Sequence, residues 1–63
     1  MAQFKLTVDM DNAAFSDQYD GQELSRILRM VADKIDDNGI PWQYQNIKDI
    51  NGNIVGKYAQ KVE

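Results

Sequence analysis

Cysteine and histidine are both absent from this chain of 63 residues, and proline occurs only once. Without cysteine the chain has no disulfide and no thiolate metal ligand. It also lacks the most common general base and the best nucleophile that enzymes use. The sequence therefore predicts a protein that is not an enzyme and carries no cofactor. Its fold must be held by packing alone, or by packing and a partner subunit.

Long apolar runs and an excess of basic residues are missing too. No apolar stretch approaches the roughly 20 residues that span a bilayer, and the first residues lack the pattern of a signal peptide. Seven basic and ten acidic residues give a formal net charge of -3, whereas nucleic-acid binding draws mainly on lysine and arginine. We therefore expect a cytoplasmic protein that binds neither a membrane nor nucleic acid directly.

The length supplies a single small domain, residues 1–63, with a thin core. Residues 3–10 alternate between apolar and polar side chains, which predicts a half-buried strand. The apolar side chains of this strand are Phe4, Leu6, Val8 and Met10. The next ten residues have no period and predict a loop, with Phe15 packed on the core.

A helix is predicted over residues 21–38. Asp20 and Glu23 have the spacing of a capping box at its start. Asn38 and Gly39 supply a left-handed end, and Pro41 prevents continuation. Spacings of three and four residues place one apolar stripe along the helix, formed by Leu24, Ile27, Leu28, Val31 and Ile35.

Residues 43–59 predict a β-hairpin with its turn at residues 51–52, because Asn-Gly between two patterned runs is typical of such turns. Two registers fit the pattern. A two-residue turn places Ile47 opposite Gly56, whereas a three-residue turn with a bulge at Gly52 places Ile47 opposite Val55. Ile54 and Val55 are both apolar, so the pattern does not choose between the registers.

The predicted fold class is α+β, with the order β-α-β-β and a three-stranded sheet that carries the helix on one face. Two topologies satisfy this order. In one, the first two strands are parallel neighbours joined by a right-handed crossover. In the other, the first strand lies antiparallel beside the third.

Four acidic residues between the first strand and the helix have the spacing of positions 1, 3, 9 and 12 of a calcium loop. These candidate metal ligands are Asp9, Asp11, Asp17 and Asp20. Ala14 stands where such a loop needs glycine, and the last position lacks the longer glutamate. A solvated acidic loop is therefore the favoured interpretation.

Aromatic and basic side chains are the candidates for a partner-binding surface. The aromatic ones either fill the core or form a contact patch on the open side of the sheet, since tryptophan and tyrosine are concentrated in interface hot spots. The basic ones lie on the helix, where a solvated face is the simpler interpretation. The candidates are Trp42, Tyr44, Tyr58, Tyr19, Arg26 and Arg29.

Three blocks, DMDNAAF (residues 9–15), ELSRILR (23–29) and DINGNIVGKY (49–58), together resemble a set of small uncharacterised phage and prophage proteins. The resemblance implies a bacterial host cytoplasm and a protein that binds a host or phage protein. It suggests an inhibitor of a host defence or metabolic protein, of the anti-CRISPR or anti-restriction type. A net charge of -3 is modest for DNA mimicry, so we expect surface occlusion. The alternative is a self-associating accessory phage protein, a homodimer for example.

Overall fold

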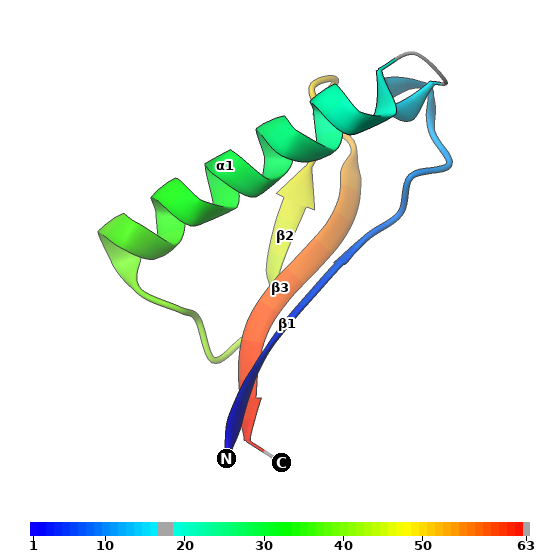
Figure 1. The fold of residues 1–63 in the computed structure, drawn as a ribbon. Helices are drawn as coiled ribbons and strands as arrows, with labels where there is room; N and C mark the ends of the chain where they lie inside the picture. The colour runs from blue at the N-terminus through cyan, green and yellow to red at the C-terminus, as the bar shows by residue number, and fades with distance from the viewer. Residues whose placement is uncertain (17–18, 63) are drawn as a thin grey trace.

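A three-stranded antiparallel sheet with one helix across one of its faces makes up the fold (Figure 1). The computed structural model describes residues 1–16 and 19–62. The elements are β1 (Ala2–Val8), the 3-10 turn η1 (Ala13–Phe15), α1 (Asp20–Asn38), β2 (Gln45–Lys48) and β3 (Ile54–Val62). The predicted α+β class and β-α-β-β order are confirmed.

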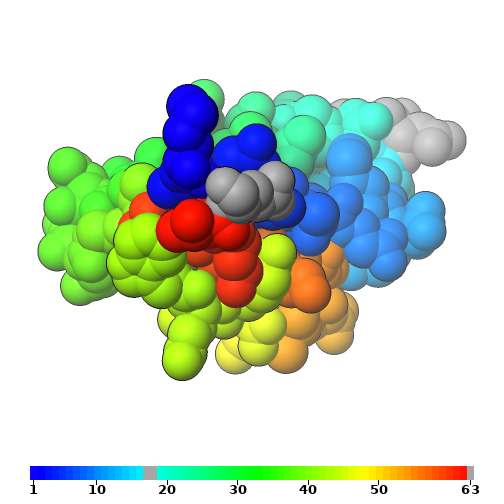
Figure 2. All heavy atoms as spheres, turned by 90° about the horizontal axis from the view of Figure 1, so that it is seen from below, coloured from blue at the N-terminus to red at the C-terminus, as the bar shows by residue number. Residues whose placement is uncertain are grey.

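The strand order is β1-β3-β2, so the last strand lies in the middle of the sheet. β1 pairs with β3 antiparallel from Ala2 opposite Val62 to Val8 opposite Gly56. Figure 2 shows the first residues (blue) and the last described residues (red) side by side. Of the two topologies that the sequence left open, the antiparallel one is present, and there is no parallel crossover among the described strands.

The core lies between α1 and the sheet. Its buried residues come from every element except β1. Leu6 and Val8 of β1 are partly buried and pack against this core. The buried apolar cluster consists of Phe15, Ile27, Val31, Ile47, Val55 and Tyr58. Leu28, expected in the apolar stripe, is 45% exposed. A sheet of three strands is narrow, and it covers the part of the stripe centred on Ile27 and Val31 but not its flank.

The helix begins differently from the prediction. Its N-cap is Tyr19, which makes no side-chain capping bond. The Asp20 carboxylate accepts a hydrogen bond from the adjacent Gly21 amide at 2.6 Å. Glu23 does not reach back to the cap, because its carboxylate is turned inward to other donors. The capping-box prediction is therefore wrong. At the other end Gly39 has φ 79° and donates its amide to Ile35, as the predicted left-handed end requires.

β1 ends at Val8, two residues before the predicted boundary. The Asp9 amide still bonds to the Val55 carbonyl, but the Asp9 carboxylate then accepts the Asp11 amide and turns the chain away. Met10 is consequently exposed. Phe4 is also exposed, although its ring contacts that of Tyr58 with centroids 6.2 Å apart. The sheet extends beyond α1 at the end where β1 begins (Figure 1).

The hairpin contains both registers that the sequence left open, one on each side of a bulge. Ile47 lies opposite Gly56, as a two-residue turn requires. Nearer the turn Lys48 lies opposite Ile54, which is the register of a three-residue turn. Val55 is the extra residue between these pairs. The loop itself spans residues 50–52, since Asp49 donates its amide to the Asn53 carbonyl and Gly52 has φ 85°.

In the part of the chain that the structure describes, no helix combines the length and apolar character needed to cross a membrane.

Candidate functional site

The two faces of the sheet differ sharply in the side chains they carry. Side chains alternate along a strand, and residues directly opposite each other share a face. Leu6 and Tyr58 are paired and belong to the α1 side, so their chain neighbours point the other way. We call the side remote from α1 the open face. Its residues are Gln3, Lys5, Thr7, Asn46, Lys48, Ile54, Lys57, Ala59 and Lys61.

The open face is basic, although the chain as a whole is acidic. It holds four of the five lysines in the sequence, Lys5, Lys48, Lys57 and Lys61. None of the three strands contains an aspartate or a glutamate. The described carboxylates lie instead on α1 and in the connections. The fold therefore separates the charges into a basic sheet face and an acidic remainder.

Tyr44 organises one end of the open face. The ammonium groups of Lys57 and Lys61 both lie over its ring, each 4.5 Å from the centroid. Lys61 also donates to the Trp42 carbonyl at 3.4 Å. Such cation–π contacts restrain long side chains that would otherwise sample many rotamers. Ala59 lies between the two lysines along β3 and is fully buried. The long side chains around Ala59 therefore cover this part of the sheet surface.

The segment after α1 is held against β3, which places these aromatic residues. The Gln60 amide donates to the Pro41 carbonyl at 2.8 Å, and the Gln60 side chain donates to the Ile40 carbonyl at 2.9 Å. Figure 2 shows this segment (yellow-green) against the end of β3 (red). Trp42 is 57% exposed and Tyr44 is 41% exposed. Both are available for contact beside the open face.

The aromatic candidates do not form one patch. Tyr58 is 4% exposed and belongs to the core under α1. Tyr19 is exposed but lies at the start of α1, whereas Trp42 and Tyr44 follow its end (Figure 1). Both interpretations of the aromatic residues therefore apply, core filling to Tyr58 and surface exposure to the other three.

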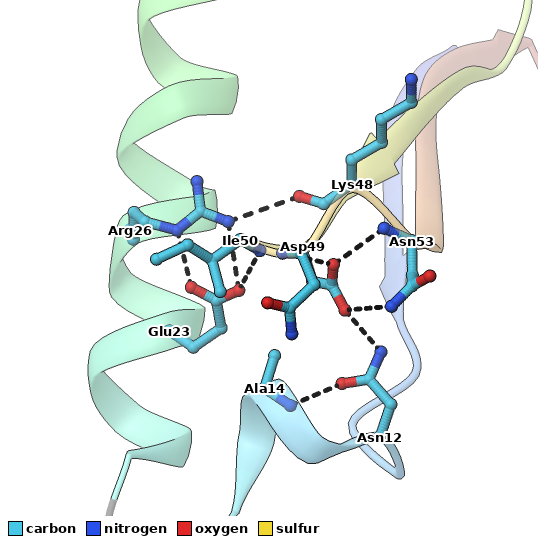
Figure 3. A network of polar contacts seen from close by, with 9 residues as sticks. Asn12, Ala14, Glu23, Arg26, Lys48, Asp49, Ile50 and Asn53 are labelled. Carbon is cyan, nitrogen blue, oxygen red and sulfur yellow. Dashed lines mark hydrogen bonds and ion pairs between the residues drawn. The ribbon is translucent and has the colours of Figure 1, made fainter.

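The two arginine candidates also separate. Arg29 is exposed on α1. Arg26 is engaged within the protein, since its Nε and Nη2 atoms donate to the two carboxylate oxygens of Glu23 at 2.6 and 3.1 Å (Figure 3). Its Nη2 also donates to the Lys48 carbonyl at 3.4 Å. Arg26 thereby joins α1 to the end of β2.

Glu23 is buried at the centre of this contact, with 6% of its surface exposed. It accepts the Ile50 amide at 2.8 Å in addition to the Arg26 guanidinium. The hydrogen bond from Arg26 lowers the pKa of Glu23, burial opposes this by raising it, and the Ile50 amide lowers it further. The net pKa lies below the usual value of 4.5, so Glu23 stays charged at neutral pH.

Asp49 is the second buried carboxylate and is surrounded by amides of the hairpin turn. It accepts the backbone amides of Asn51 and Asn53 at 2.9 and 2.8 Å. The Asn12 side-chain nitrogen donates to it at 2.7 Å (Figure 3). The Asn12 side-chain oxygen accepts the Ala14 amide and so caps η1. Burial raises the pKa of Asp49, but the hydrogen bonds from Asn53, Asn12 and Asn51 outweigh burial and hold it below 3.8.

Three segments of the sequence, residues 9–15, 23–29 and 49–58, meet in this network. Asn12 belongs to the first segment, Glu23 and Arg26 to the second, and Asp49 and Asn53 to the third. Every buried side-chain nitrogen and oxygen in the described residues has a hydrogen-bond partner. The network therefore fastens the hairpin turn and η1 to α1, and its role in the described structure is architectural.

The candidate metal ligands divide between the described and undescribed parts of the chain. Asp17 lies outside the described residues. The Asp9 and Asp20 carboxylates accept nearby backbone amides, from Asp11 and Gly21. Across residues 1–16 and 19–62, no group of three acidic side chains is placed to hold a metal ion.

Sequence reasoning anticipated an open side of the sheet but missed its basic character, because the net charge of the chain is -3. The signal was nevertheless present, since every charged residue within the three strands is a lysine. Comparisons with protein-family models, with curated proteins and with solved structures yield no significant match for this chain.

Proposed function

We propose that this domain is a non-enzymatic protein-binding module that works by occupying a surface of its partner. The observation that carries the proposal is the open face, which α1 leaves uncovered and which bears lysines beside the exposed Trp42 and Tyr44. Tryptophan and tyrosine are enriched in interface hot spots because they bury much area at little entropic cost.

The chemistry of the site supports binding over catalysis. The chain has no histidine and no cysteine. The two buried carboxylates, Glu23 and Asp49, are saturated by hydrogen bonds within the protein. A hollow of about 440 Å³ borders Glu23 and Arg26, but these charged groups are already paired with each other. General acid–base chemistry needs a titratable group within reach of a substrate, and neither buried carboxylate offers one.

The biological setting that we propose is a bacterial cytoplasm during phage or prophage expression, as the resemblance of the three blocks implies. In that setting the module blocks a host defence or metabolic protein by surface occlusion. The basic open face supports occlusion over DNA mimicry, because a DNA mimic presents ordered carboxylates where this face presents lysines.

Sedimentation velocity in a bacterial host lysate tests the proposal. Because the chain has no cysteine, Ala32→Cys on the exposed side of α1 gives a unique position for a fluorescent label. We expect a saturable, faster-sedimenting complex that excess unlabelled protein competes away. The double variant Lys57→Glu/Lys61→Glu should lose this complex, whereas Lys34→Glu on α1 should keep it. The proposal fails if no complex forms, or if the double variant forms it as well as the wild type.

Self-association is the second candidate function, and the exposed edge of the sheet favours it. β1 has seven residues and pairs on one side only within the described structure. An open edge strand is a template for pairing with a second copy. The same sedimentation experiment without lysate should then show a dimer at micromolar concentration.

A further inference from the structure

The proposed function does not say what kind of surface the partner presents. The charge of the open face indicates this. We infer that the surface docked on the open face is an acidic patch of another protein, in which aspartate or glutamate carboxylates meet the lysines. This inference rests on the proposed function, since it takes the open face to be the contact surface. Its basis is charge complementarity. All charged residues of the three strands are lysines, and the rest of the molecule is acidic.

The lysines lie in a compact group. Lys57 and Lys61 are four residues apart on β3, which corresponds to about 13 Å along an extended strand. Lys5 lies opposite Ala59, midway between them on the neighbouring strand. Three lysines of the open face are thus the neighbours of one buried alanine, and Lys48 extends the group toward the hairpin turn. Because the ammonium groups of Lys57 and Lys61 lie over one ring, the patch matches a few carboxylates on one or two turns of a helix, or on one short loop.

Two of these ammonium groups are fixed before any partner arrives. Lys57 and Lys61 are held over the Tyr44 ring, and Lys61 is further held by the Trp42 carbonyl. Ordering a long side chain at an interface costs about 0.5–1.5 kcal/mol, and prior restraint reduces that cost. Buried or rim charges also steer a complementary partner and reject one of like charge. The arrangement is therefore suited to selective docking of carboxylates.

The same contacts favour a protein over a nucleic acid. Single-stranded nucleic acids bind to basic grooves in which several aromatic rings are free to stack on bases. Beside the open face the Tyr44 ring already holds two ammonium groups, which leaves Trp42 as the one exposed neighbouring ring without such a contact among those described. The domain measures 37 × 23 × 17 Å and carries its carboxylates on α1 and the connections. A long polyanion that extends past the open face would approach those carboxylates and be repelled by them, most strongly at low salt. A compact acidic patch avoids this repulsion.

A second copy of the chain is a weaker occupant. The exposed Asp33, Asp36 and Asp37 of α1 are acidic, but α1 and the open face lie on opposite sides of the sheet. Contact between them would be head-to-tail, and such contacts give open chains unless the rotation closes a ring. A separate acidic partner can bind the open face in a closed complex without any need for ring closure.

Fluorescence anisotropy with a short fluorescein-labelled oligoglutamate peptide tests the inference. We expect the intact protein to bind this peptide at low salt, with affinity that falls as salt rises. Lys57→Glu/Lys61→Glu should weaken binding by about tenfold or more, and Lys57→Gln/Lys61→Gln by less. Lys34→Glu, on α1, is the matched control and should stay within about twofold of the wild type. Thermal melts of all variants show whether each one is folded.

Three results would overturn the inference. The first is no binding of oligoglutamate at low salt by folded wild-type protein. The second is tighter binding of an oligothymidylate of equal charge, lost in the same double variant, which would make the open face a nucleic-acid site. The third is concentration-dependent association of the protein alone that the double variant abolishes. If oligoglutamate fails while the lysate complex persists at high salt, the proposed function stands and only the acidic partner is excluded.

Discussion

Replacing Gly56 with alanine would place a methyl carbon 2.0 Å from the Thr7 carbonyl oxygen and 3.1 Å from the Val8 Cα. Real Cβ atoms essentially never approach other heavy atoms closer than 3.0 Å. The β1 backbone would therefore have to move away by about 1 Å, at the point where Val8 pairs with Gly56 and where little free volume exists to absorb the shift. The obstacle is backbone, so a change of rotamer cannot relieve it.

Overpacking of this kind costs about 1–3 kcal/mol and occasionally more. A domain of this size has a total stability of about 3–9 kcal/mol at the usual value per residue. We expect Gly56→Ala to lose about 3 kcal/mol, because it also weakens the end of the β1–β3 ladder. The assay is urea unfolding followed by far-UV circular dichroism. Gly21→Ala is the matched control, since nothing lies within 4 Å of its added carbon and the position is helical.

The control should be neutral or more stable by up to about 1 kcal/mol, because alanine restricts the unfolded chain and favours the helix. A Gly56→Ala protein as stable as the wild type would refute the close approach of β1 and β3. So would a control that loses as much stability as Gly56→Ala.

Three further predictions concern the core and the buried carboxylates. Ile27→Ala removes a side chain with no exposed surface and should lower the free energy of unfolding by about 2–5 kcal/mol. Leu28→Ala, at a side chain that is 45% exposed, should lower it by less than about 1 kcal/mol. Equal losses in urea unfolding would contradict the orientation of the helix on the sheet. The folded-state pKa values of Glu23 and Asp49 lie below 4.5 and 3.8. Their contribution to the free energy of unfolding is therefore complete above those values, and it is lost as pH falls through the folded-state pKa values. The melting temperature should therefore hold from neutral pH to about pH 5 and drop steeply below it; a melting temperature that rises on acidification would exclude this account. Glu23→Gln removes one of the two titrating groups and leaves Arg26 without its ion pair, so it should lower the melting temperature at neutral pH and flatten its acid dependence; an unchanged acid slope would show that Glu23 does not contribute.

The element order was predictable because each element has its own period or its own turn signal. The helical spacing of Ile27 and Val31, the alternation around Leu6 and the Asn51-Gly52 turn each act locally in the chain. Strand order was not predictable on this basis, since both topologies bury the same apolar side chains. The choice is settled by long-range pairing of β1 with β3, which leaves no local signature.

The hairpin register escaped prediction because both candidate registers are present. The bulge at Val55 lets Ile47 face Gly56 while Lys48 faces Ile54. Gly56 is the residue that the close approach of β1 requires, and a glycine inside a strand pattern often marks such an approach. The sequence contained that signal, but its meaning depends on knowing that β1 is the neighbour.

The burial of two carboxylates was not predicted, for a different reason. Glu23 has the spacing of a capping box, and Asp49 carries no signal of burial in the sequence. Each is buried because distant amides converge on it, from Asn12 for Asp49 and from Ile50 for Glu23. Convergence of this kind is a property of the tertiary structure. The basic open face was missed similarly, since the side on which a lysine lies depends on the register.

The most direct test of the central claim is a two-dimensional ¹⁵N–¹H NMR titration of the folded protein with the oligoglutamate peptide. The account predicts saturable amide shifts along β1 and β3, strongest around Lys5, Ala59 and Lys61, together with the Trp42 and Tyr44 signals. Signals of α1 around Asp33 should stay in place. Shifts centred on α1, or no shifts at a peptide excess in low salt, would contradict the assignment of the open face as an acid-binding surface.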